Sequence, residues 1–115
     1  MSLIEREVQK MDKEKIVNDF NESTELQEKV RCILFIRRKI GHLSAEDVAK
    51  RCGLTKQTVR NIELGKHNYV PSLMAVSEAL DCHFYEVVLS LEEKGYFDKY
   101  IQDNAKRFIT SAWKG

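Results

Sequence analysis

The chain has 115 residues, about the length of one small domain, and 43% of them are hydrophobic while 32% are charged, as in globular proteins. Nineteen basic and eighteen acidic residues give a net charge of +1, which argues against a nucleic-acid-binding protein because such domains are usually basic. One proline and five glycines are too few for the many turns of an all-β domain, so the composition predicts a mostly helical chain.

The charges are unevenly distributed along the chain. Residues 1–30 carry five bases and eight acids, residues 31–70 carry nine bases and three acids, and residues 71–115 carry five bases and seven acids. The middle segment therefore has a charge of +6 between flanks of −3 and −2. A positive block of this kind is typical of an anion-binding face, although an ordinary solvated surface would give the same count.

Several classes of protein are excluded by local patterns. The longest unbroken apolar run is Cys32–Ile36, whereas a membrane span needs about 20 residues. Residues 1–15 alternate acids and bases without the pattern of a secretory signal, so we expect a cytoplasmic protein. The cysteines are odd in number and form no Cys-x-x-Cys pair, which predicts reduced core residues and disfavours disulfides and a zinc site.

Two amphipathic helices are predicted in the first 41 residues. In the first, residues 3–20, apolar side chains recur at helical spacing with a slip in register midway. They are Ile4, Val8, Met11, Ile16, Val17 and Phe20. Thr24 is followed three positions later by Gln27, a capping-box arrangement that predicts the start of the second helix. This helix should end near Gly41, which suits the left-handed C′ position.

Two short helices are predicted next, over residues 45–52 and 56–64. Four residues that favour helix ends delimit them: Ser44, Gly53, Thr55 and Gly65. Asp47 lies at the third position of the first helix, where its charge favours the helix start. The connection of about three residues is so short that the two helices must cross at a steep angle.

Apolar residues of this unit lie where two crossing helices would share a core. Ala49 is small where the first helix meets the second, and Gly53 permits a positive φ at the turn. Val48, Val59 and Ile62 form the shared apolar wedge. This order of residues is typical of a helix-turn-helix motif.

Further motifs accompany this unit between Ile33 and Val88: Arg38, Leu43–Ala49, Gly53–Thr55, Ile62–Lys66, Pro71–Leu73, Ala79 and Leu80. On these residues the stretch resembles the Cro and Xre-like (lambda-repressor-like) helix-turn-helix family. The resemblance implies an all-α, five-helix bundle, here with additional N-terminal and C-terminal helices, that binds operator DNA as a dimer without a cofactor. It also implies a structural ion pair between Arg38 and Glu63. The chain departs from the family at Ala45, where a phosphate-contacting glutamine is common.

Helix 56–64 is the predicted recognition helix. With its apolar side turned inward, five side chains are predicted to contact base edges in the major groove: Lys56, Gln57, Thr58, Arg60 and Asn61. Carboxamides pair with adenine, cationic side chains with guanine or phosphate, and the threonine methyl with thymine. Phosphate contacts are predicted for Ser44, Thr55, Lys66, Asn68 and Tyr69.

Two further helices are predicted over residues 73–80 and 84–91, and an aromatic stripe at helical spacing follows Gly95. The N-terminal and C-terminal helices must bury their stripes either in their own bundle or against a second copy of the chain. Because helix-turn-helix proteins gain affinity by binding two half-sites, we expect a homodimer. The residues predicted to form its interface are Phe97, Tyr100, Ile101, Phe108, Ile109 and Trp113.

The predicted organisation is an N-terminal helix and candidate oligomerisation arm (1–22), a DNA-binding domain (23–93) and a C-terminal dimerisation helix (94–115). The histidines are too scattered to bind a metal, and no catalytic set or phosphate-binding loop is present, so no metal, cofactor or enzymatic activity is expected. The leading function is a transcriptional regulator of phage or mobile-element type, binding double-stranded DNA. Two alternatives remain: an autoregulating antitoxin with a toxin as protein partner, or an interaction module that no longer binds DNA.

Overall fold

The computed structural model describes the backbone of residues 10–112 and the side chains of residues 12–104. Within these residues the chain forms seven α-helices and no strand, so the predicted all-α bundle is confirmed. The helices are α2 (Lys10–Glu22), α3 (Thr24–Ile40), α4 (Ala45–Cys52), α5 (Lys56–Glu63), α6 (Val70–Ala79), α7 (Phe84–Glu92) and α8 (Tyr96–Ala112). Several residues of the predicted stripes lie outside the described side chains: Ile4, Val8, Met11, Phe108, Ile109 and Trp113.

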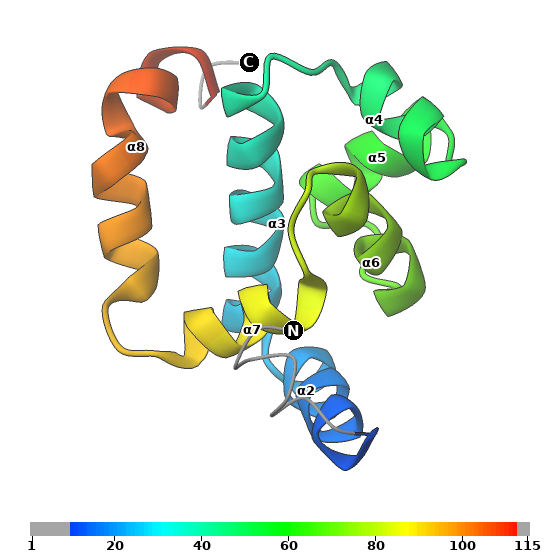
Figure 1. Ribbon diagram of the computed structural model, residues 1–115, viewed down its shortest axis with the longest axis vertical. Coiled ribbons are helices and arrows are strands. Elements are labelled where there is room, and N and C mark those ends of the chain that lie inside the picture. Colours follow the sequence, from blue (N-terminus) through cyan, green and yellow to red (C-terminus); the bar gives the residue numbers. More distant parts are fainter. Residues whose placement is uncertain (1–9, 113–115) are drawn as a thin grey trace.

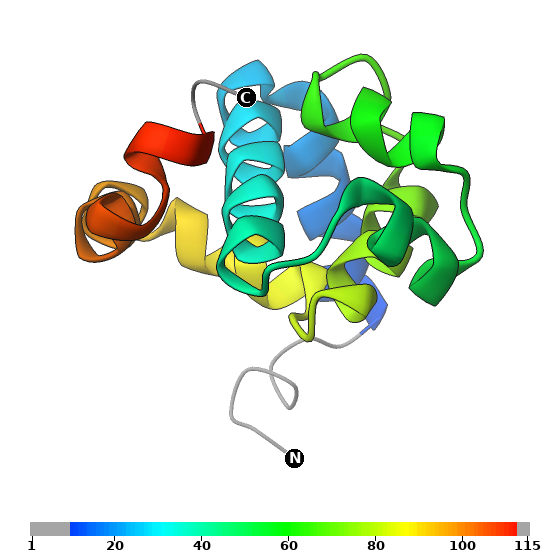
Figure 2. The same cartoon turned by 90° about the horizontal axis from the view of Figure 1, so that it is seen from above.

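Helix α3 is the centre of the fold (Figure 1). Helix α8 runs along one side of it, α4, α5 and α6 lie on the other side, and α2 and α7 pack near its N-terminal end. The view from above shows the same division (Figure 2). The unbroken apolar run Cys32–Ile36 explains this position, because consecutive apolar residues on a helix point to more than one side.

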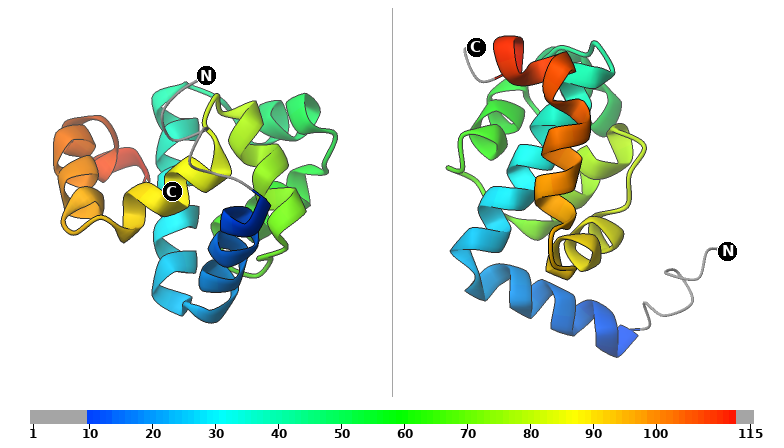
Figure 3. Two further views of the ribbon diagram at one scale, coloured as in Figure 1. Left: turned by 60° about the horizontal axis from the view of Figure 1, so that its bottom comes forward. Right: turned by 90° about the vertical axis from the view of Figure 1, so that its left-hand side faces the viewer.

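Two apolar clusters hold the helices together. The larger contains side chains from each of the helices α2 through α7. Its fully buried members include Phe20, Val30, Leu34, Val48, Val59, Ile62, Leu73 and Val88. The smaller lies under α8, where Tyr100 and Ile101 pack with Ile36 of α3. The helix-turn-helix unit therefore belongs to the larger cluster, and α8 covers the far side of α3 (Figure 3).

Helix α2 is part of the larger cluster. Ile16 is 3% exposed and Phe20 is fully buried, with its ring meeting that of Phe84 in α7 edge to face at 5.4 Å between centroids. Both residues were predicted to lie on the apolar face of the N-terminal helix. That face is buried in the chain's own bundle, which leaves Ile16 and Phe20 unavailable to an oligomerisation arm.

The predicted start of α3 was wrong in its details. Ser23, not Thr24, is the N-cap: its Oγ accepts a hydrogen bond from the Leu26 N–H at 3.1 Å. The side chain of Gln27 reaches back instead and donates to the carbonyl oxygens of Phe20 and Asn21. Because α2 continues to Glu22, only Ser23 is left between the two helices to take the extended backbone of a cap.

The predicted end of α3 near Gly41 is confirmed, because the helix ends at Ile40, but the left-handed position was predicted one residue too early. Gly41 has φ −77° and is not left-handed, whereas His42 has φ 56°. The N–H of Leu43 donates to the Arg38 carbonyl and that of His42 to the Lys39 carbonyl, which is the Schellman pattern with His42 at C′. The left-handed residue is therefore His42, although the neighbouring Gly41 would adopt this conformation more readily.

The described part of α8 packs on its own chain. Phe97, Tyr100 and Ile101 are all half-buried, Tyr100 stacks on Tyr96, and the Phe97 ring lies 5.6 Å from Lys29 Nζ of α3. Three of the residues predicted to form a dimer interface therefore already contact α3. Among the helices described here, none has the length and apolar character needed to cross a membrane.

Candidate nucleic-acid interface

Helices α4 and α5 form the predicted helix-turn-helix unit. Their shared wedge is buried: Val48, Ala49, Val59 and Ile62 are each 3% exposed or less. Gly53 between them has φ 73°, the left-handed conformation expected at this turn. The predicted caps are confirmed, because the hydroxyl of Ser44 accepts from Asp47 N–H and that of Thr55 from Thr58 N–H. Both helices are therefore fixed on one side and exposed on the other.

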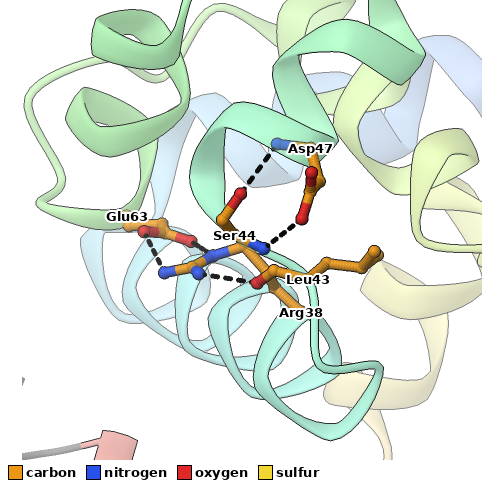
Figure 4. Close-up of polar contacts among 5 residues, drawn as sticks. All are labelled: Arg38, Leu43, Ser44, Asp47 and Glu63. Atoms are coloured by element: carbon orange, nitrogen blue, oxygen red, sulfur yellow. Dashed lines mark hydrogen bonds and ion pairs between the residues drawn. The ribbon is translucent and has the colours of Figure 1, made fainter.

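A buried ion pair ties the end of α5 to α3 (Figure 4). Arg38 Nε donates to Glu63 Oε2 at 2.5 Å and its Nη2 to Glu63 Oε1 at 3.0 Å, while Nη1 donates to the Leu43 carbonyl at 2.9 Å. The two side chains are only 6% and 9% exposed. A bidentate pair of this kind restricts the relative position of both partners. It therefore sets where α5 ends relative to the central helix.

The first turn of α4 is closed by a capping box (Figure 4). Ser44 N–H donates to Asp47 Oδ2 at 2.9 Å, in return for the bond from Asp47 N–H to Ser44 Oγ. Hydrogen bonding of the Asp47 carboxyl, chiefly to the backbone N–H of Ser44 and to a smaller extent to its side chain, holds the pKa of that carboxyl below its usual value. The Ser44 amide is thus occupied by a carboxylate and is not available to a phosphate.

The outer face of α5 carries the predicted base-contacting side chains. Lys56, Gln57 and Arg60 are exposed, and Thr58 and Asn61 are partly exposed. Gln57 Nε2 donates to Asn61 Oδ1 at 3.0 Å, and the hydroxyls of Thr55 and Thr58 lie 2.8 Å apart. The side chains of Lys56 and Arg60 make no hydrogen bond or ion pair with any residue whose side chain is described. The geometry therefore brings all five onto one accessible surface.

The loop after α5 continues this surface. Lys66 is exposed, Asn68 is partly exposed, and Tyr69 is 63% exposed directly before α6. Leu64 at the end of α5 is 53% exposed, although sequence reasoning did not assign it a role. The predicted phosphate contacts Lys66, Asn68 and Tyr69 thus lie together on the loop that follows α5.

Arg31 joins this region from α3 and was not identified from the sequence. Its guanidinium lies so close to Gly65 that a Cβ there would collide with it, and its Nη2 pairs with Glu28 at 3.3 Å. No local signal could have identified this contact, because Arg31 and Gly65 are distant in the chain. It adds a cationic group beside the turn that leads into the loop.

Residues 34–87 match a family model described as helix-turn-helix. The chain carries a helix-turn-helix domain of the Cro and Xre-like family. Proteins of this family are DNA-binding regulators, and the matched segment contains α4, α5, α6 and the buried ion pair. Neither the search of curated proteins nor that of solved structures found a match.

The Cro and Xre-like domain of this chain differs from its family at Ala45. The residue is 4% exposed and belongs to the larger apolar cluster. Where other members present a glutamine, a methyl group here packs inward at the start of α4. The Ala45 side chain therefore has no polar group to offer, and the side-chain cap at the start of α5 comes from Thr55.

Two further observations concern metal and thiol chemistry within the described residues. They contain no group of three or more His, Cys, Asp or Glu side chains that could hold a metal ion. The cysteines are unpaired, and burial raises the pKa of the Cys32 thiol to about 11. At neutral pH this thiol is protonated, which makes it a poor nucleophile.

Proposed function

We propose that the protein is a sequence-specific transcriptional regulator, a repressor of phage or mobile-element type, that reads the major groove with α5 as a homodimer. The observation that carries this proposal is the contrast between the two sides of α5. Val59 and Ile62 are 1% exposed, Glu63 is bound to Arg38, and the opposite side presents only polar side chains. A rigidly held helix with a polar, accessible face is suited to read base edges.

The distribution of charge supports the same function. Of the nine bases between residues 31 and 70, Lys56, Arg60 and Lys66 are exposed on α5 or its following loop. The segment's charge of +6 can attract phosphates locally, although the whole chain carries only +1. The acidic flanks reduce non-specific attraction to DNA, which depends on the total number of neutralised phosphates.

Selection of binding sites from random duplex DNA tests the function directly. We expect a preferred sequence with two related halves whose centres are one helical turn apart, because a symmetric dimer presents two copies of α5. Recovery of no preferred sequence would contradict the proposal. That result would support the alternative in which the domain serves only in protein interaction.

We expect Gln57→Ala and Arg60→Ala each to weaken binding to the selected duplex by about 1–3 kcal/mol and to relax the preference at one base position. The cause is the loss of a hydrogen-bonding side chain that distinguishes bases. Fluorescence anisotropy with the selected duplex and its single-base variants measures both effects. Gln102→Ala, at an exposed position of α8, is the control and should leave both unchanged. If Gln57→Ala and the wild-type protein bound the selected duplex and all its single-base variants with equal affinity, Gln57 would not contact a base.

We expect Lys66→Ala to weaken binding to all duplexes alike and to reduce the slope of log K against log salt by about 1. A phosphate contact carries no base information, but its loss removes one counterion-releasing charge. Titrations over a range of salt concentrations measure the slope. Lys99→Ala removes the same charge at an exposed position of α8 and should not change the salt slope. A change in base preference on Lys66→Ala would be inconsistent with a phosphate contact.

The homodimer is proposed from the aromatic stripe of the C-terminal helix. Phe97, Tyr100 and Ile101 are half-buried against α3, so their exposed parts are available for a second copy. In the sequence the same stripe continues at Phe108 and Trp113, which lie outside the described side chains. We expect sedimentation equilibrium of the full chain at micromolar concentration to give twice the mass of one chain. Replacing Phe108 and Trp113 by serine should shift the mass toward one chain. A monomeric wild type would contradict this part of the proposal.

A further inference from the structure

A pocket of about 430 Å³ lies between α3, the beginning of α8 and the end of α5. Helix α8 begins beside the N-terminal half of α3 (Figure 1), and the two helices line the pocket with Phe35 and Cys32 of α3 and Phe97 of α8. Glu63 forms the wall toward α5. We call this site the α3–α8 pocket. Its volume falls in the range of about 300–1,000 Å³ that is typical of small-molecule sites.

The charged residues of the α3–α8 pocket are sorted by depth. Lys29 and Glu25 form an ion pair at 3.0 Å, in which the lysine side chain is 30% exposed and the glutamate side chain 78%. Arg31 and Glu28 form a second pair at 3.3 Å, with 28% of the arginine and 62% of the glutamate side chain exposed. In both pairs the cation is the more buried partner, and the carboxylate is the one that faces water.

This difference in depth decides which charge an occupant of the pocket meets. Water and salt screen exposed charges more strongly than partly buried ones, so Lys29 and Arg31 act on the interior more than their carboxylate partners do. The third carboxylate of the lining, Glu63, is already bound by two nitrogens of Arg38. Burial raises the pKa of the Cys32 thiol, and the charge of Arg31 lowers it, which shows that this cation acts on the α3 wall. The interior therefore favours an anion.

Both aromatic rings of the pocket already have a cation close by. Lys29 Nζ lies 5.6 Å from the centroid of the Phe97 ring. The Phe35 ring has the Arg38 guanidinium carbon at 5.2 Å and Lys39 Nζ at 5.6 Å. The attraction between a cation and an aromatic ring is thus supplied by the chain itself, and a further cation would be repelled. The rings can still pack against a flat apolar group.

We propose that the α3–α8 pocket binds a small aromatic carboxylate, with its ring against Phe35 and Phe97 and its carboxylate at Lys29 and Arg31. A guanidinium can hold a carboxylate by two parallel hydrogen bonds. The carboxylate of the ligand competes only with exposed pairs within one helix, which are weak. The proposal is independent of DNA recognition, because the pocket is not part of the outer face of α5 and its binding can be measured without DNA.

Three probes that share one ring system and differ in charge test this selectivity. They are 1-naphthoate, the uncharged 1-naphthamide and the cationic 1-naphthylmethylamine. Titration of the ¹⁵N-labelled full chain, followed by NMR, measures each dissociation constant and locates the site. We expect 1-naphthoate to bind saturably, about tenfold more tightly than 1-naphthamide, and the amine to bind least. The largest shifts should be at the backbone amides of Lys29, Arg31, Cys32 and Phe97.

Substitutions of the paired residues should act in opposite directions. Lys29→Gln and Arg31→Gln should each weaken binding of 1-naphthoate about tenfold, because each removes a charged donor. Glu25→Gln and Glu28→Gln should each strengthen it about twofold, because each removes a competing carboxylate. A gain of affinity on removal of an acid is not expected from damage to the fold. Circular dichroism of each variant checks that the helices are intact.

The chain offers a matched control at a second pocket of about 430 Å³. There Lys13 Nζ lies 5.5 Å from the Tyr85 ring centroid, which resembles the geometry of Lys29 and Phe97. The described lining of this second pocket includes one lysine and one aromatic ring, whereas the α3–α8 pocket has two cations and two rings. Lys13→Gln should therefore leave the affinity for 1-naphthoate unchanged.

Four outcomes would overturn the proposal. The first is the absence of saturable binding of 1-naphthoate up to its solubility limit. The second is equal affinity for the carboxylate and the amide, which would show that only the aromatic ring is recognised. The third is an affinity unchanged by both Lys29→Gln and Arg31→Gln, and the fourth is a set of shifts centred on Lys13 and Tyr85. Each of these results leaves the proposed DNA-binding function unaffected.

Discussion

Arg38→Ala is expected to lower the free energy of unfolding by about 3–5 kcal/mol. The substitution leaves Glu63, whose side chain is 9% exposed, as a buried carboxylate without its bidentate partner. It also removes the donor that Arg38 provides to the Leu43 carbonyl. Urea denaturation followed by circular dichroism measures the change, which should appear in the midpoint with little change in the slope.

The chain offers a matched control for this ion pair. Glu46 and Lys50 form a pair in α4 that is 60% and 75% exposed, with 3.8 Å between the charged atoms. Lys50→Ala should change stability by less than about 0.5 kcal/mol because solvent screens exposed pairs. A double variant, Arg38→Met with Glu63→Leu, should be less destabilised than Arg38→Ala, since no buried charge is left alone. A loss on Arg38→Ala no larger than that on Lys50→Ala would show that the pair does not anchor α5.

Phe20→Ala is the second large effect expected, with a loss of about 3–5 kcal/mol. The Phe20 side chain is fully buried between α2 and α7, and its edge-to-face contact with Phe84 is lost along with the buried apolar surface. Thermal and urea denaturation measure the loss. Because a small domain has only about 5–15 kcal/mol in total, Phe20→Leu provides a milder variant if Phe20→Ala does not fold.

Phe97→Ala makes the same chemical change at a half-buried position of α8 and is the control for Phe20. We expect a smaller loss of unfolding free energy for Phe97→Ala, because folding buries less apolar surface at Phe97 than at Phe20. Similar losses at the two positions would indicate that α2 is only loosely attached. The larger loss at Phe20 would place α2 within the folding unit, although the match to the family model begins only at residue 34.

Local features of the candidate site were predictable because they depend on neighbours in the chain. The capping box of Ser44 and Asp47 and the turn at Gly53 follow from side chains that bond to, or permit, the adjacent backbone. The bond between Gln57 and Asn61 also follows from i, i+4 spacing, but spacing alone does not distinguish it from two independent side chains. The contact of Arg31 with Gly65 has no local signal at all.

The sequence by itself determined the helices, the short turn between α4 and α5 and the concentration of positive charge there, because helical period, caps and charge are properties of adjacent residues. Only the tertiary structure decided where each apolar face is buried. Phe20 is fully buried in the larger cluster, whereas Tyr100 is half-buried and packs against both clusters, although both residues lie on similar amphipathic stripes. Burial depends on which surfaces meet in space, and helical period shows only that a face must be covered.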